Sequence, residues 1–224
     1  MHASIAHAIY RGERRQFVPR MNAADARFKR LNVRHGRNAW MRNAFHFATN
    51  DPSFLPIASY SQGEKKHEVN LLIGFLHPDN LKNADGWCGC AFILRAKTCS
   101  VERHDLPIKV SHHAVLRLMQ RVDIANVHQA LTWLLPAVHY ILAVEPDPCP
   151  TDKLLPCISG GVIGLQDQQE PEAWVFVTYV DDDKLFPNQL AELEDRKRTL
   201  KETMAAFGLR KELSGCRGGQ IALA

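Results

Sequence analysis

The chain has 224 residues, of which 46% are hydrophobic and 23% charged, and its formal net charge is +4 at pH 7. The length suffices for one large domain or two small ones, and this composition is that of a globular protein, which excludes wholesale disorder. No segment approaches the roughly 18 apolar residues that a membrane span needs, and the start lacks the apolar region of a secretory signal. We therefore expect a cytoplasmic protein, in its own cell or in a target cell after export, with no membrane partner.

Residues 1–52 are predicted to form an Arg-rich N-terminal extension, in which residues 22–31 are compatible with a helix. Ten Arg or Lys lie between residues 11 and 42, against two acidic residues. Such stretches are attracted to phosphate backbones, so Arg14, Arg15 and Arg30 are candidate nucleic-acid-binding residues. The alternative interpretation is a solvated arm without a specific partner.

Residues 53–208 are predicted to form an α+β core domain, followed by a loose tail over residues 209–224. After a polar loop over residues 59–68, we expect a buried strand or a short helix over residues 69–76. Strands are predicted over residues 87–96, 98–103 and 106–110. A helix over residues 111–122 follows, then a second over residues 126–135 that ends before Pro136, and a Pro-rich loop over residues 146–156. A β-hairpin is predicted over residues 160–180, and a long helix over residues 187–207 that ends at Gly208. This order predicts a small, largely antiparallel sheet packed against helices.

The helix over residues 111–122 is the strongest candidate for a site. Ser111 is a good N-cap, and the apolar residues Val115, Leu118, Met119 and Val122 are spaced to face the core. At about 100° per residue, His113, Arg117, Gln120 and Arg121 point away from that stripe, whereas His112 lies beside its edge and is the weaker candidate.

This polar face has chemistry that suits RNA cleavage. Histidine can accept and donate a proton near neutral pH, and two guanidinium groups can hold a phosphate and stabilise the charge of its transition state. RNA supplies its own nucleophile, the 2′-OH, so we expect neither a metal nor another cofactor. The alternative is that three cationic groups at i, i+4 spacing are mere solvent coverage, although such groups repel one another and often meet an anion.

The run SHHAVLRLMQRVDI resembles the H-A-x-x-R-x-x-x-R segment of a family of small bacterial domains of unknown function. Those domains are similar to the barnase–EndoU–colicin–RelE (BECR) ribonuclease toxin superfamily, in which a helix is followed by a short antiparallel sheet. The resemblance covers residues 107–183 and implies a BECR-like core, to which this chain adds the N-terminal extension and the long C-terminal helix. It implies a metal-independent endoribonuclease, acting as a toxin or effector, with RNA as partner and a cognate inhibitor or immunity protein.

The same resemblance assigns His113, Arg117 and Arg121 to catalysis, together with a Thr or Tyr on a late strand. The matching residues are Thr178 and Tyr179 of WVFVTYV, and alternation sends one of them to each face of the sheet. Neighbouring residues do not decide between them. Thr178 is preferred as the catalytic residue on the resemblance alone, with Tyr179 and Gln120 as nucleic-acid contacts.

Other sites are less well supported by the sequence. Cys88-Gly89-Cys90 departs from the spacing of structural zinc sites, and Asp181-Asp182-Asp183 is typical of a solvated turn. The main rival function is non-catalytic: the same basic face could bind nucleic acid or an acidic protein. A third possibility is that the helix over residues 187–207 docks on another helix, although core packing is the simpler interpretation.

Overall fold

The computed structural model describes residues 1–30, 36, 39–40, 43–44, 46–47, 55–62, 70–78, 86–95 and 97–206. The elements follow one another as α1 (Ala3–Lys29), β1 (Leu55–Gln62), β2 (Asn70–Pro78), β3 (Trp87–Arg95), β4 (Ser100–Val110), α3 (His112–Arg121), α4 (Val127–Trp133), α5 (Leu135–Ala143), β5 (Lys153–Pro156), β6 (Gly161–Gln166), β7 (Trp174–Val180), the 3-10 turn η1 (Asp182–Lys184) and α6 (Pro187–Ala206). The predicted α+β class is confirmed. None of the helices described here combines the length and the apolar character needed to cross a membrane.

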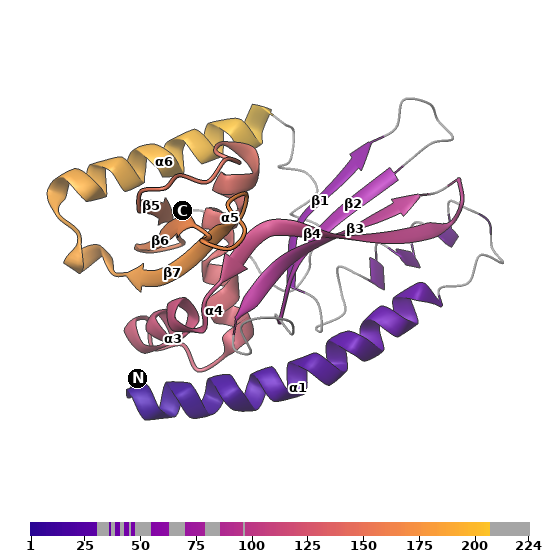
Figure 1. Ribbon diagram of the computed structural model, residues 1–224, viewed down its shortest axis with the longest axis horizontal. Coiled ribbons are helices and arrows are strands. Elements are labelled where there is room, and N and C mark those ends of the chain that lie inside the picture. The colour runs from indigo at the N-terminus through magenta and orange to yellow at the C-terminus, as the bar shows by residue number, and fades with distance from the viewer. Residues whose placement is uncertain are drawn as a thin grey trace.

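Within the described residues, the strands form one seven-stranded sheet in the order β1-β2-β3-β4-β7-β6-β5. Neighbouring strands are antiparallel except β4 and β7, which pair in parallel from Ile108 opposite Trp174 to Val110 opposite Phe176. Strands β5 to β7 lie among α3, α5 and α6, whereas β1 to β4 extend beyond these three helices and α1 runs alongside them (Figure 1). The sheet is therefore largely antiparallel, as predicted, but larger than expected.

Helix α3 confirms the prediction for residues 111–122. The Ser111 hydroxyl accepts a hydrogen bond from the Ala114 N–H at 3.1 Å, which caps the helix. Val115, Leu118 and Met119 are fully buried in the main core, together with side chains of α4, α5 and β7. The apolar spacing thus identified the face that packs.

Several predicted elements differ from those observed. Residues 59–62, predicted as loop, belong to β1, and the two short strands predicted over residues 98–110 are the single strand β4. Pro136 does not end a helix; it lies in the first turn of α5, where its missing N–H costs nothing. The Pro-rich segment also contains β5, which is an edge strand, and proline is tolerated in edge strands.

Helix α1 joins the predicted N-terminal extension to the core. It is one helix of 27 residues that packs on α3 and α4 and carries Ala6 and Tyr10 into the main hydrophobic core. The buried Trp87 Nε1 donates a hydrogen bond to the Tyr10 hydroxyl at 3.1 Å, and the Glu13 carboxylate accepts one from the Val127 N–H at 2.7 Å. The boundary expected at residue 52 therefore does not separate α1 from the core.

Helix α6 covers the opposite side of the molecule from α1 (Figure 1). It packs against α5 and β5 and buries Leu193 and Leu200 of its predicted apolar face, while Leu190 and Met204 of that face are half-buried. Core packing therefore accounts for this face. The predicted C-cap Gly208 and the tail over residues 209–224 lie outside the described residues.

Candidate functional site

The start of α3 is fixed against β7. The Ser111 N–H donates to the Phe176 carbonyl at 2.9 Å, and the Ser111 hydroxyl donates to the Val177 carbonyl at 2.9 Å. One serine thus caps α3 and ties it to the strand that follows β4 in the sheet. This arrangement sets the direction in which the polar face of α3 points.

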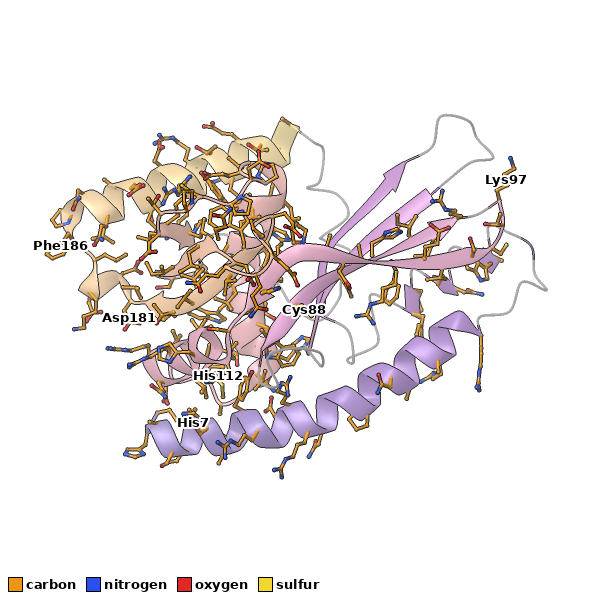
Figure 2. All side chains as sticks on the ribbon, in the orientation of Figure 1. His7, Cys88, Lys97, His112, Asp181 and Phe186 are labelled. Carbon is orange, nitrogen blue, oxygen red and sulfur yellow. The ribbon has the colours of Figure 1, made fainter. Side chains whose placement is uncertain are left out.

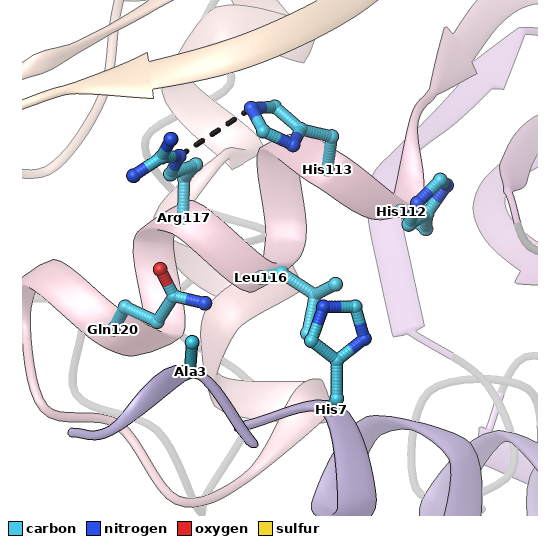
Figure 3. Close-up of a pocket in the computed structure, with 7 residues that line it drawn as sticks. All are labelled: Ala3, His7, His112, His113, Leu116, Arg117 and Gln120. Atoms are coloured by element: carbon cyan, nitrogen blue, oxygen red, sulfur yellow. Dashed lines mark hydrogen bonds between the residues drawn. The ribbon is translucent and has the colours of Figure 1, made fainter. Parts of the chain in front are cut away.

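A surface pocket of about 270 Å³ lies between α1 and α3. Figure 3 shows His113 and Arg117 on one side of the pocket and His7 of α1, beside Leu116, on the other. The pocket is lined by Ala3, His7, His112, His113, Leu116, Arg117 and Gln120. Three of the predicted site residues, His113, Arg117 and Gln120, are therefore brought together.

Two histidines of this pocket did not figure among the predicted site residues. The sequence favoured His113 over His112, because His112 lies beside the apolar edge of α3. In the structure α1 packs on α3, and His112 lines the pocket between the two helices. His7 comes from a helix 105 residues earlier in the chain. Figure 2 places both residues on the same side of the molecule. A sequence signal for His7 existed, because His7, Arg11 and Arg15 repeat the spacing of His113, Arg117 and Arg121.

His113 and Arg117 form the centre of the candidate site. The Arg117 Nε donates to the His113 Nε2 at 3.4 Å, a long hydrogen bond for which His113 must be neutral at that nitrogen. Partial burial, and then the charges of Arg117, His112 and His7, lower the pKa of His113 below its usual 6.5. At neutral pH His113 is therefore an unprotonated base beside a guanidinium group.

Arg121 lies apart from this pair. Its Nη1 is 3.5 Å from the Asp181 Oδ2, just after β7, and it does not line the pocket. Burial raises the pKa of Asp181, while the charge of Arg121 opposes that rise. The predicted clamp of two arginines is thus divided: Arg117 is free of carboxylates within the described residues, and Arg121 is held by one.

A β-bulge decides how Thr178 and Tyr179 are placed. Ile163 pairs with Thr178 and the next residue, Gly164, pairs with Phe176, so Val177 is an extra residue on β7. The bulge reverses the alternation, and Tyr179 rather than Thr178 shares the buried side with Phe176.

Tyr179 is 5% exposed, and its hydroxyl donates to the Ser159 carbonyl at 3.0 Å. Because its ring and hydroxyl are engaged in the core, the prediction of Tyr179 as a nucleic-acid contact is not supported. Thr178 is half-buried on the other side and does not line the pocket.

The predicted basic residues of the N-terminal extension also separate. Arg14 is half-buried, and its Nη2 donates to the Gly86 carbonyl at 3.3 Å, so it faces the protein. Arg15 is exposed on α1. Arg30 is exposed just beyond the end of α1, and at about 1.5 Å per residue it lies roughly 20 Å from Arg15 along the helix.

Asp181, Asp182 and Asp183 and the cysteines do not form a metal site within the described residues. Among the described residues, no three or more His, Cys, Asp or Glu side chains are grouped so that they could hold a metal ion. Asp181 contacts Arg121, Asp182 accepts a hydrogen bond from the Ser159 hydroxyl at 2.7 Å, and Asp183 pairs with Lys184. No disulfide joins any two of the five cysteines that the structure describes.

Comparison of the chain with protein families, with curated proteins and with solved structures finds no match. The resemblance to the BECR ribonuclease toxins therefore stays a prediction.

Proposed function

We propose that this protein is a metal-independent endoribonuclease, acting as a toxin or effector, whose active site is the pocket between α1 and α3. One observation carries the proposal: the His113 Nε2 accepts a hydrogen bond from Arg117, an arginine that has no carboxylate partner among the described residues. The lowered pKa of His113 favours its neutral, basic form. A base beside a guanidinium group that no carboxylate occupies is the minimum that cleavage through the 2′-OH requires, because RNA supplies the nucleophile.

His113 is the general base in this proposal. Its Nε2 removes the proton of the 2′-OH, the 2′-oxygen attacks phosphorus, and the bond from phosphorus to the 5′-oxygen breaks. The products are a 2′,3′-cyclic phosphate and a 5′-hydroxyl. The departing 5′-oxygen takes a proton from His7 or His112, the other histidines that line the pocket.

Arg117 binds the phosphate that reacts. Its hydrogen bond to His113 is long, so a phosphate can draw the guanidinium group away and leave the His113 Nε2 free to act as base. Gln120 adds a polar contact from the next turn of the helix. Arg121, held by Asp181, contributes positive charge from beside the pocket rather than a direct clamp.

The test is RNA cleavage in the presence of EDTA by the wild type and by His113→Ala. We expect the variant to cleave about 100- to 10,000-fold more slowly, the usual contribution of a general base, while binding of 2′-O-methyl RNA changes little. His104→Ala is the matched control, because His104 is an exposed histidine of β4 that does not line the pocket. Arg117→Ala should lose about 100- to 1,000-fold, as for one donor to a transition-state oxygen.

Expression of the wild type should arrest growth and fragment RNA, and His113→Ala should do neither. A cognate inhibitor, if the protein is such a toxin, would relieve the arrest caused by the wild type. If the wild type binds RNA with a steep dependence on salt and forms no product, the protein is a nucleic-acid-binding module. Loss of cleavage in EDTA, with no effect of His113→Ala, would instead indicate a metal-dependent nuclease.

A further inference from the structure

Most basic side chains of the sheet and α6 lie near carboxylates, and Lys201 of α6 is an exception. These ion pairs join Arg95 to Glu102, Lys109 to Asp167, Lys153 to Glu145, Arg196 to Glu192, Lys197 to Glu194, and Arg198 to Asp195. Arg11, Arg15 and Arg117 differ, because they are exposed and, within the described residues, no carboxylate lies at salt-bridge distance from them. Unneutralised positive charge thus gathers on α1 and α3.

Arg11 and Arg15 continue from the pocket along α1. With His7, which lines the pocket, they occupy positions i, i+4 and i+8, so the three side chains follow one side of the helix over about 12 Å. We call His7, Arg11 and Arg15 the α1 stripe. Like charges one turn apart destabilise a helix slightly. Arg11 and Arg15 therefore do not stabilise α1 more than uncharged polar residues would.

Glu13, which lies between Arg11 and Arg15 in the sequence, does not neutralise the α1 stripe. Glu13 lies on the side of α1 that faces the core, where its carboxylate accepts a hydrogen bond from the Val127 N–H at 2.7 Å. Arg14, between the stripe and the core, is also turned inward. The outward side of this part of α1 therefore keeps its positive charge.

We infer that the α1 stripe binds the phosphates of a single-stranded RNA next to the bond placed in the pocket. This inference rests on the proposed function and extends it, since it makes the substrate a strand of several nucleotides. A flexible strand can follow the convex surface of a helix from the pocket past Arg11 to Arg15. A stiff duplex would reach fewer of these side chains.

The experiment measures binding of 2′-O-methyl RNA, which the protein cannot cleave, by fluorescence anisotropy over a series of salt concentrations. A dinucleotide and a decanucleotide are compared on the wild type, on Arg11→Ala/Arg15→Ala, and on Arg198→Ala/Lys201→Ala. The last variant removes the same charge from exposed positions of α6, on the opposite side of the molecule (Figure 1). It therefore controls for net charge.

We expect Arg11→Ala/Arg15→Ala to bind the decanucleotide more weakly than the control variant does. The two double variants should bind the dinucleotide with equal affinity. Each phosphate contact of a single strand contributes about 0.7 to the slope of log affinity against log salt, so losing two should lower the slope by about 1.4. Equal slopes in the two double variants would overturn the inference. So would tighter binding of polyglutamate than of RNA of equal charge, which would indicate an acidic protein partner.

Cleavage of unmodified RNA by the same variants separates this inference from the proposed function. If the wild type cleaves RNA but the two double variants bind the decanucleotide alike, the α1 stripe is not a binding surface and the ribonuclease proposal stands. If the slope falls as expected and the wild type cleaves nothing, the α1 stripe stands as an RNA-binding surface and the ribonuclease proposal fails.

Discussion

Two glycine-to-alanine substitutions should change stability in opposite directions. Gly12 lies within α1, and a Cβ added there meets nothing within 4 Å. Gly160 precedes β6 with φ +64°, and a Cβ there would lie 2.6 Å from the Tyr179 hydroxyl and too close to the Val180 carbonyl oxygen. An added methyl group therefore has open space at Gly12 and would clash with neighbouring atoms at Gly160.

The magnitudes follow from these surroundings. Gly12→Ala should stabilise the protein by about 0.8–1.0 kcal/mol, because alanine loses less backbone entropy in a helix. Gly160→Ala should destabilise it by about 2–5 kcal/mol, as the sum of about 1–2 kcal/mol for a left-handed alanine and about 1–3 kcal/mol for overpacking. For a chain of this size each kcal/mol shifts Tm by about 2–4 °C.

The assay is thermal unfolding followed by circular dichroism, with urea unfolding as a second measure of the free energy. Gly12→Ala should raise Tm by about 2–4 °C, and Gly160→Ala should lower it by at least about 4 °C. A lower Tm in Gly12→Ala would refute the helical placement of Gly12. An unchanged Tm in Gly160→Ala would refute the close approach of this turn to β7.

Three further predictions concern side chains around the site. The pKa of His113, measured by NMR, should lie below 6.5. It should rise in Arg117→Gln, because a neighbouring cation is removed. This pKa is lower in the folded than in the unfolded chain. His113 therefore contributes to the free energy of unfolding above pH 6.5, and this contribution is lost as the pH falls through the pKa of His113 in the folded chain. Glu13→Ala should lower the free energy of unfolding by about 1.5–3 kcal/mol, because a charge-assisted hydrogen bond to the Val127 N–H is lost, and Glu13→Gln should lower it less. Tyr179→Phe should cost about 1 kcal/mol in urea unfolding, because its hydrogen bond to the Ser159 carbonyl is lost, and Thr178→Val should cost less.

Each of these predictions has an outcome that contradicts it. A His113 pKa that is at or above 6.5, or that does not change in Arg117→Gln, would mean that the pair does not exist in solution. Equal stability of Glu13→Ala and wild type would mean that α1 does not cap α4. If Thr178→Val costs more than Tyr179→Phe, the bulge at Val177 is misplaced and the simple alternation of β7 is right.

The polar and apolar sides of α3 were predictable because they depend on local periodicity. Ser111 caps the helix, and the spacing of Val115, Leu118 and Met119 determines which side is buried whatever it packs against. The hairpin of β6 and β7 was also predictable from a local signal, because turn residues separate two apolar runs. The orientation of Tyr179 was not, because a bulge depends on pairing with β6 and leaves no mark in the alternation of a single strand.

The sequence by itself determined that α3 presents His113, Arg117, Gln120 and Arg121 on one polar side, since a helix of this periodicity leaves no other arrangement. Tertiary structure alone decided how that side is divided. Helix α1 packs on α3 and adds His7 to the pocket with His113 and Arg117, while Asp181 at the end of β7 holds Arg121. These contacts join residues about 60 to 110 positions apart, and local periodicity carries no information about such distances in the chain.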